Sequence, residues 1–225
     1  SEDKSKQSSD ETNWTEFDTK IYKNFKAALE ARNKLAEEAE DKTEKENLKV
    51  DYVVPTAGET ISLGEAKMTF YGPLENDYQY GRTVDLNTRQ ENKYSIVTKI
   101  VYGSNSFLMT GDAQKETIEK IIAKGYDLTA QVLKEPHHGF QDVTEEELAN
   151  GYQYSDHKTV IDASQASIAI ISNGYMNTGG VPYTKVLRDL SKLDVYETGD
   201  RGTIIVTSDG SQLSIQTEKG DNQPS

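Results

Sequence analysis

The string SFLMTGDA, residues 106–113, is followed after a short helical pattern by VLKEPHHG, residues 132–139. Each string opens with an apolar run typical of a buried strand and ends in polar residues. Between them, residues 114–123 repeat isoleucine at the spacing of a helix. A strand, a helix and a strand of this length return a chain to the same edge of a sheet. The sequence therefore predicts an α/β layered fold.

Candidate chemistry lies where these two strands end. Asp112 follows the first strand, and His137 with His138 follows the second. A carboxylate and an imidazole that meet at one sheet edge are typical metal ligands. Because adjacent side chains on extended backbone point in opposite directions, we expect one histidine to face the metal and the other to act as acid or base. The alternatives are that Asp112 caps the following helix and that the histidines only pack.

Further elements are expected on both sides of this segment. Strands are predicted at residues 49–54, 61–63, 66–71, 94–101, 167–171, 195–196, 202–207 and 212–216, and a helix at 183–193. Residues 76–92 are rich in Tyr, Asn and Gly and predict a long loop, a feature that is often functional. Tyrosines at positions 71, 78, 80, 94 and 102 predict either an aromatic wall or ordinary packing.

Four further polar candidates are weaker. His157 lies in a polar stretch and is predicted to be an ordinary exposed histidine. Ser172, Asn173 and Asn177 follow a buried strand, where they line a pocket or form a turn.

The N-terminal part differs from the rest in composition. Residues 1–49 hold 23 charged residues but only six of the 46 Leu, Ile, Val and Phe residues of the chain. We expect a flexible linker at 1–16 and a helical segment at 17–46, in which a helix of about 20 residues continues as a solvated extension or a hairpin. The apolar core is expected within 47–217, followed by a flexible tail at 218–225.

Composition excludes several functions. The chain has no cysteine, so it has no disulfide, no cysteine-based zinc finger and no thiol nucleophile. No apolar run approaches the roughly 20 residues of a membrane span. The net charge is −13, and residues 50–225 carry 15 basic against 25 acidic side chains. Extended nucleic acid is therefore disfavoured as a substrate, and a small phosphoester or a cell-envelope polymer is favoured.

The order of these strings resembles a known family. Tyr94–Val97, Ser106–Ala113, Val132–Gly139, Ser172–Gly174 and Gly202–Gly210 are similar to the C-terminal half of metallo-β-lactamase-fold hydrolases. The branch resembled is the extracellular hydrolase domain of ComEC-type competence proteins and its free-standing bacterial relatives. The resemblance covers roughly residues 50–216.

The resemblance implies an αββα sandwich with one or two metal ions, usually zinc, with manganese as an alternative. Asp112 matches the carboxylate that bridges the two metals, and His138 matches a ligand of the second metal. His137 matches the neighbouring histidine that orients or protonates a substrate oxygen. The implied activity is hydrolysis of a phosphoester or phosphodiester by a metal-activated water.

Two departures from the family pattern shape the remaining expectations. The family's His-x-His-x-Asp-His string is absent, and a customary histidine near the last helix is replaced by Val181. The chain is therefore expected to be the C-terminal part of the domain, with its exposed sheet face covered by the missing N-terminal half or by a second copy of the chain. A secreted or cell-surface bacterial protein is expected. The alternative is a non-catalytic binding module that uses the Tyr-rich loop 76–94.

Overall fold

The computed structural model describes residues 20–51, 54, 56–74, 92, 94–140, 157–174 and 180–220. Within it the chain forms two compact units that divide between residues 54 and 55. The predicted loop at 76–92 lies outside the described residues except for Asn92, and so do the predicted linker at 1–16 and most of the tail. Among the described helices, none combines the length and the apolar character needed to cross a bilayer.

The first unit is a pair of helices, α1 (Lys20–Glu38) and α2 (Lys42–Leu48). The Asp41 side chain caps α2 by accepting a hydrogen bond from the Glu44 N–H at 2.8 Å. Asn33 on α1 pairs with both backbone groups of Val50, at 2.8 and 3.0 Å. Of the two alternatives for this region, the structure therefore forms the hairpin, in which α2 packs against α1.

The second unit is built on a seven-stranded sheet with the strand order β1-β2-β3-β4-β5-β6-β7. Its strands are β1 (Thr60–Leu63), β2 (Ala66–Gly72), β3 (Val97–Tyr102), β4 (Asn105–Met109), β5 (Val132–Lys134), β6 (Ile168–Ile171) and β7 (Asp194–Glu197). The strands β1 to β4 are antiparallel, and β4 to β7 are parallel. The predicted strand at 49–54 is wrong at residues 49–51 and 54, which are described but form no strand.

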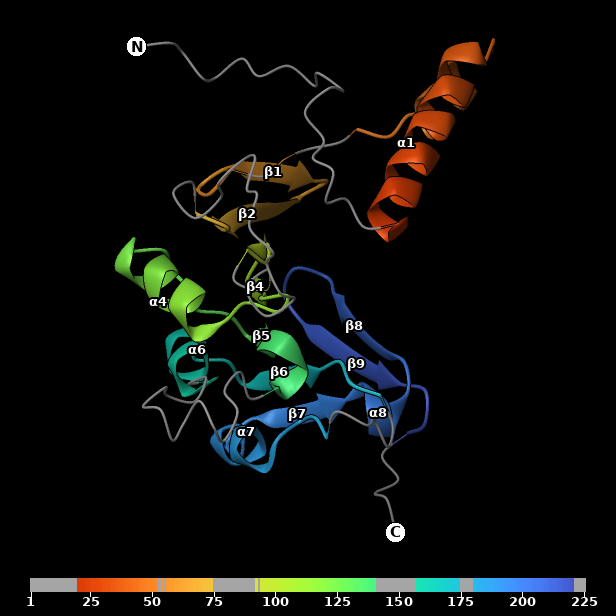
Figure 1. Cartoon of the computed structure of the whole chain (residues 1–225). Coiled ribbons are helices and arrows are strands. Elements are labelled where there is room, and N and C mark those ends of the chain that lie inside the picture. The colour runs from red at the N-terminus through yellow and green to blue at the C-terminus, as the bar shows by residue number, and fades with distance from the viewer. Residues whose placement is uncertain are drawn as a thin grey trace, which may run out of the picture. The chain divides into compact units, whose positions relative to one another are not determined.

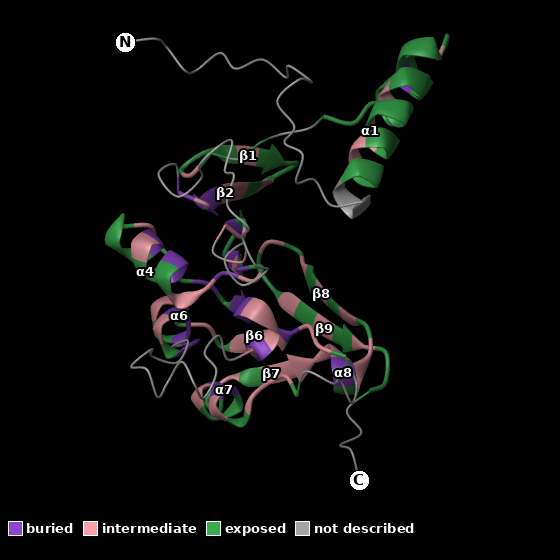
Figure 2. Cartoon of the chain, in the orientation of Figure 1, coloured by how far each residue is buried: buried purple, intermediate pink, exposed green. Residues whose placement is uncertain are grey.

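Helices cover one face of this sheet (Figure 1). They are α4 (Lys115–Ala123), α6 (His157–Ser164) and α7 (Thr184–Asp189). Leu108, Leu133 and Ile171 on the strands are fully buried against this layer, and Ile121 on α4 is buried with them. Figure 2 shows this buried region between the central strands and the helices. Burial of apolar surface here stabilises the fold.

A small second sheet lies against the opposite face (Figure 1). It consists of β8 (Ile204–Ser208) and β9 (Leu213–Thr217), which pair antiparallel. Side chains alternate along β4, so Asn105 points away from the face that carries Leu108. The Asn105 amide donates to Ser208 Oγ at 2.8 Å and to the Gln212 carbonyl at 3.1 Å.

The unit thus has helices, a seven-stranded sheet and a two-stranded sheet in successive layers, which confirms the predicted α/β layered class. The second face of the large sheet is not fully covered by described residues, since Leu63 and Met109 remain 49% and 41% exposed. The apolar run that contains β4 predicts a buried strand, and this expectation is wrong at Met109.

Candidate functional site

The ends of β4 and β5 meet at one edge of the large sheet. The two strands run parallel, with Met109 beside Lys134. Thr110 Oγ1 donates to the Lys134 carbonyl at 2.6 Å, and the His137 N–H donates to the Gly111 carbonyl at 3.0 Å. These two bonds tie the segment that leaves β4 to the segment that leaves β5. The predicted return of the chain to the same sheet edge is confirmed.

A tight turn, Pro136–Gly139, carries the two histidines. The expectation of extended backbone is wrong here, because His137 has φ 47° and His138 has φ 59°, both in the left-handed region. Such conformations cost about 1–3 kcal/mol each for non-glycine residues and concentrate at functional sites. The turn is held by contacts on its far side, where Tyr183 N–H donates to the Gly139 carbonyl at 3.0 Å.

His138 has a defined tautomer and a defined direction. Its Nδ1 lies 2.6 Å from the Ser172 carbonyl oxygen, which can only accept, so Nδ1 carries a proton. In the neutral ring the lone pair is therefore on Nε2. Nε2 lies 3.4 Å from Asp112 Oδ1, and both side chains are partly exposed, at 45% and 36%. The structure thus brings together the carboxylate and the imidazole expected from the sequence.

Asp112 reaches this position without capping a helix. The N-cap of α4 is Gln114, which makes no side-chain capping bond, so the alternative that Asp112 caps this helix is wrong. The backbone N–H of Asp112 donates instead to Ser95 Oγ at 3.1 Å. Gly111 precedes it with φ 55°, a left-handed conformation that lets the strand turn sharply. The local backbone therefore directs this carboxylate toward His138.

His137 faces a different partner from its neighbour. Its Nε2 lies 3.0 Å from the Asn92 side-chain amide nitrogen, a group that donates. Its ring also packs against Phe140, with the ring centres 5.0 Å apart. The expected division of roles between two adjacent histidines is compatible with this geometry, although the cause is the left-handed turn rather than strand alternation. Sequence reasoning did not single out Asn92.

Lys134 adds a positive charge beside Asp112. Its Nζ donates to the Glu135 carbonyl at 2.7 Å. Burial lowers the pKa of Lys134, while the negative charges of Asp112 and Glu135 oppose this shift. An ammonium held near the site can attract an anionic substrate. The only sequence signal for this residue was its place at the end of a buried strand.

His157 is buried, so the prediction of an exposed histidine is wrong. Its relative exposure is 7%, and its Nδ1 lies 2.6 Å from Glu135 Oε1. The polar neighbours of His157 in the sequence gave no sign of this, because its acidic partner lies 22 residues earlier.

Of the other polar candidates, one lies at the site and one has a structural role in a turn. Ser172 lines the site through the contact of its carbonyl with His138. Asn173 forms a turn, since its Oδ1 accepts from the Gly199 N–H at 2.9 Å and its amide donates to Glu197 at 3.0 Å. Asn177 lies outside the described residues.

Tyr71 and Tyr102, two of the predicted tyrosines, make separate contacts and form no common wall. Tyr71 stacks on Tyr126 with ring centres 4.8 Å apart and donates to the Asp127 carbonyl, which is core packing. Tyr102 donates to Glu65 on the surface at 3.2 Å. Positions 78 and 80 fall outside the described part of the chain.

The Asp112–His138 pair fits one side of a metal site. Two ligands on a tetrahedral zinc, each about 2.1 Å from the ion, lie about 3.4 Å apart. The observed separation of 3.4 Å matches this spacing. The described residues contain no group of three or more acidic, histidine or cysteine side chains that could hold an ion. They therefore supply two ligands, and a closed zinc site needs four.

No family model matches the chain. ComE operon protein 3 of Bacillus subtilis (strain 168) is 33% identical to it over 116 residues. The match covers 51% of this chain and only 13% of that protein's length. It supports the resemblance to ComEC-type competence proteins for about half of the chain.

A solved structure from Parabacteroides distasonis ATCC 8503, provisionally assigned as a metal-dependent hydrolase, also aligns with the chain. The alignment covers 71% of this chain and 62% of that one, with 11% identity and a TM-score of 0.38. A likeness of this size adds nothing to the assignment of the site. The chain is thus similar, over half of its length, to a bacterial competence-operon protein.

Proposed function

We propose that the chain is the C-terminal part of a metal-dependent hydrolase that cleaves a phosphoester or phosphodiester bond. The observation that carries this proposal is the fixed direction of His138. The Ser172 carbonyl holds the proton on Nδ1, and Nε2 then lies at ligand spacing from Asp112. A bound zinc or manganese ion would supply Lewis acidity and a water of lowered pKa.

The chain's own residues have separate parts in this proposal. Asp112 and His138 are the metal ligands on one side of the site. His137, hydrogen-bonded to Asn92, orients or protonates an oxygen of the substrate. Lys134 stands near Asp112 and offsets the negative charge of a phosphate group.

The remaining ligands have to come from outside the described residues. The exposed second face of the sheet, with Leu63 and Met109, supports the same view, because isolated domains rarely leave such a face open. We propose that an N-terminal half of the same domain, or a second copy of the chain, covers it. A secreted or cell-surface bacterial location and a small phosphoester or cell-envelope substrate belong to the same proposal.

Histidine side-chain NMR tests the metal pair directly, since the chain has only three histidines. Zinc is expected to shift the Nε2 signal of His138 at concentrations that leave His157 unchanged. Asp112→Asn should weaken this response, while Asp51→Asn, which alters an exposed carboxylate that follows the helical hairpin, should not. The proposal would be overturned by a His138 signal that does not change on addition of zinc. It would also be overturned by equal responses to zinc in Asp112→Asn and Asp51→Asn.

Hydrolysis is tested with bis(4-nitrophenyl) phosphate as the substrate. The assay compares this chain with a version extended upstream of Ser1, each with zinc, with manganese and with a chelator. Metal-dependent turnover that is lost in Asp112→Asn is the expected result.

A non-catalytic binding module is the second candidate, favoured by the two-ligand count and by Val181 in place of the customary histidine. Zinc binding at His138 without turnover in either version would establish it.

A further inference from the structure

A second histidine–carboxylate pair lies behind the turn that carries His137 and His138. Glu135 is fully buried and His157 is 7% exposed. His157 Nδ1 lies 2.6 Å from Glu135 Oε1. The other carboxylate oxygen, Oε2, is buried with no hydrogen-bond partner among the described residues. Burial of an unpaired carboxylate costs free energy, so the contact with His157 is the interaction that offsets the burial of Glu135.

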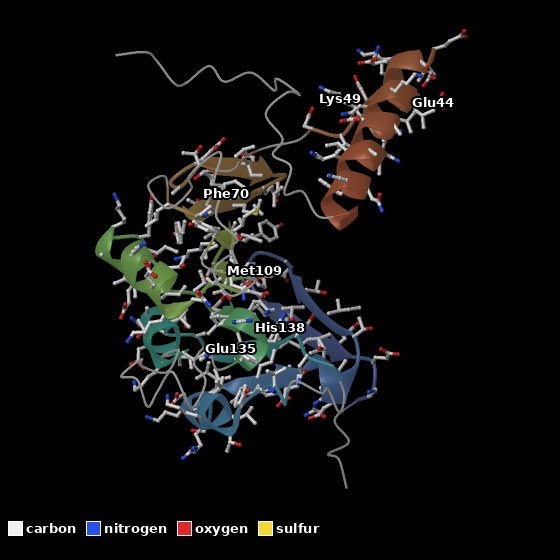
Figure 3. The ribbon with its side chains drawn as sticks, viewed as in Figure 1. Glu44, Lys49, Phe70, Met109, Glu135 and His138 are labelled. Atoms are coloured by element: carbon white, nitrogen blue, oxygen red, sulfur yellow. The ribbon has the colours of Figure 1, made fainter. Side chains whose placement is uncertain are left out.

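The same histidine also holds the far end of the turn. His157 Nε2 lies 2.8 Å from the Phe140 carbonyl oxygen, which can only accept, so Nε2 carries a proton. Glu135 is the residue before Pro136, and Phe140 is the residue after Gly139. One side chain on α6 therefore contacts both the entry and the exit of the turn. Glu135 and His138, both labelled in Figure 3, belong to the short segment that follows β5.

The turn needs such support because its backbone is unfavourable. Three consecutive residues, His137, His138 and Gly139, have positive φ angles of 47°, 59° and 72°. Strained conformations persist only where surrounding contacts over-determine them. The Phe140 N–H bond to the His137 carbonyl, at 2.8 Å, closes the turn internally. The two bonds of His157 are external to the turn and span its ends.

We propose that His157, paired with Glu135, is a positioning residue that keeps the His137–His138 turn in its left-handed form. Through the turn it keeps Nε2 of His138 directed at Asp112. His157 touches neither the Asp112 carboxylate nor the His138 ring in any described contact, so its effect is indirect. The positional effect stands without the proposed function, whereas its importance for metal binding rests on that function.

The test separates positioning from simple stabilisation by using a matched control. His157→Ala removes both bonds. Val160→Ala truncates a side chain of the same helix that is 2% exposed and packs in the core. Both variants are expected to lower the urea midpoint. Only His157→Ala is expected to speed hydrogen exchange at the His137 and Phe140 amides, by about tenfold over Val160→Ala.

The Nδ1–H signal of His138 provides a second readout. It is expected to stay in its hydrogen-bonded position in Val160→Ala and to weaken or move in His157→Ala, since the bond to the Ser172 carbonyl depends on the direction of the ring. Neither readout requires metal or turnover, so failure of the proposed function leaves both intact. Equal exchange rates in the two variants, with an unchanged His138 signal, would overturn the proposal.

Two conservative variants keep the test decisive if His157→Ala does not fold. His157→Asn places an amide near the position of Nδ1 and retains a bond to Glu135. His157→Gln places an amide near Nε2 and retains the bond to Phe140. Each variant lacks one of the two bonds, so each is expected to exchange faster than Val160→Ala and slower than a chain that lacks both bonds. If neither variant exchanges faster than Val160→Ala, loss of either bond leaves the turn protected, and the proposal is overturned.

Discussion

Two histidine–carboxylate pairs flank one turn, and they are built in opposite ways. The Glu135–His157 pair is buried, has a separation of 2.6 Å, and bonds to the backbone beyond it. The Asp112–His138 pair is partly exposed and has a separation of 3.4 Å. The buried pair makes its contacts within the protein, although Glu135 Oε2 has no hydrogen-bond partner among the described residues. The longer separation of the exposed pair leaves room for a third group between its two side chains. The contrast favours a supporting role for the first pair and agrees with the metal-binding role proposed for the second.

The largest expected effect comes from breaking the buried pair. Glu135→Ala should destabilise the chain by about 3–5 kcal/mol, because it removes one partner of a buried pair and leaves a cavity. Asp112→Ala should change stability by about 0.5 kcal/mol or less, because its pair is open to water. Urea unfolding of the two variants measures the difference. Equal losses would remove the distinction between the pairs.

The turn between the two pairs provides the next test. Gly139→Ala places a Cβ 2.7 Å from the Pro182 Cβ at a position with φ 72°. We expect a loss of about 2 kcal/mol, from backbone strain and from the clash together. Gly125→Ala is the matched control, since φ is 81° there and nothing lies within 4 Å of the new Cβ. It should cost about 1 kcal/mol, from strain alone.

The NMR signal of the His138 Nδ1–H provides a second readout for the two glycine variants. Gly139→Ala is expected to move the Nδ1–H signal of His138, because displacement from Pro182 shifts the turn. Gly125→Ala, which lies in the loop after α4, should leave it in place. A His138 signal that is the same in both variants would mean that the close packing of Gly139 against Pro182 does not orient the His138 ring.

Sequence reasoning reached the exposed pair but not the buried one. The strand–helix–strand pattern was enough to place Asp112 and His138 at one sheet edge, since parallel neighbours end together. The left-handed turn was not predictable, because histidine rarely adopts positive φ and the string gives only proline and glycine as turn signals. The periodicity of apolar residues indicates which residues face the core. It does not indicate that the Ser172 carbonyl places the proton of His138 on Nδ1.

The error at His157 has a specific cause. Its neighbours Ser155, Asp156 and Lys158 are polar, so local composition indicates exposure. Its burial depends on Glu135, a contact formed only once α6 packs beside the turn. Pairwise long-range partners of this kind leave no local pattern in a single sequence.

A third ion pair, Lys99–Asp127, provides a benchmark for partly exposed carboxylates. The hydrogen bonds from Lys99 and Thr129 lower the pKa of Asp127 from 3.8 to about 2. The unfolded chain therefore binds this proton at a higher pH than the folded chain. The stabilisation is complete above 3.8 and is lost as the pH falls from there toward about 2. Because the Asp127 side chain is 66% exposed, solvent screening limits its size to about 1 kcal/mol.

Asp127→Asn is accordingly expected to change stability much less than Glu135→Ala. At pH 7 the variant should be less stable than the native chain by about 1 kcal/mol or less, and the gap should narrow as the pH falls below about 4. Urea unfolding across this range measures it. Asp51→Asn, at a more exposed pair with Lys49, is the control. Its free energy of unfolding should equal that of the native chain at every pH in this range. If Asp127→Asn instead costs as much as Glu135→Ala, then exposure does not separate the ion pairs of this chain. The weak coupling assigned to Asp112 and His138 would then lose its physical basis.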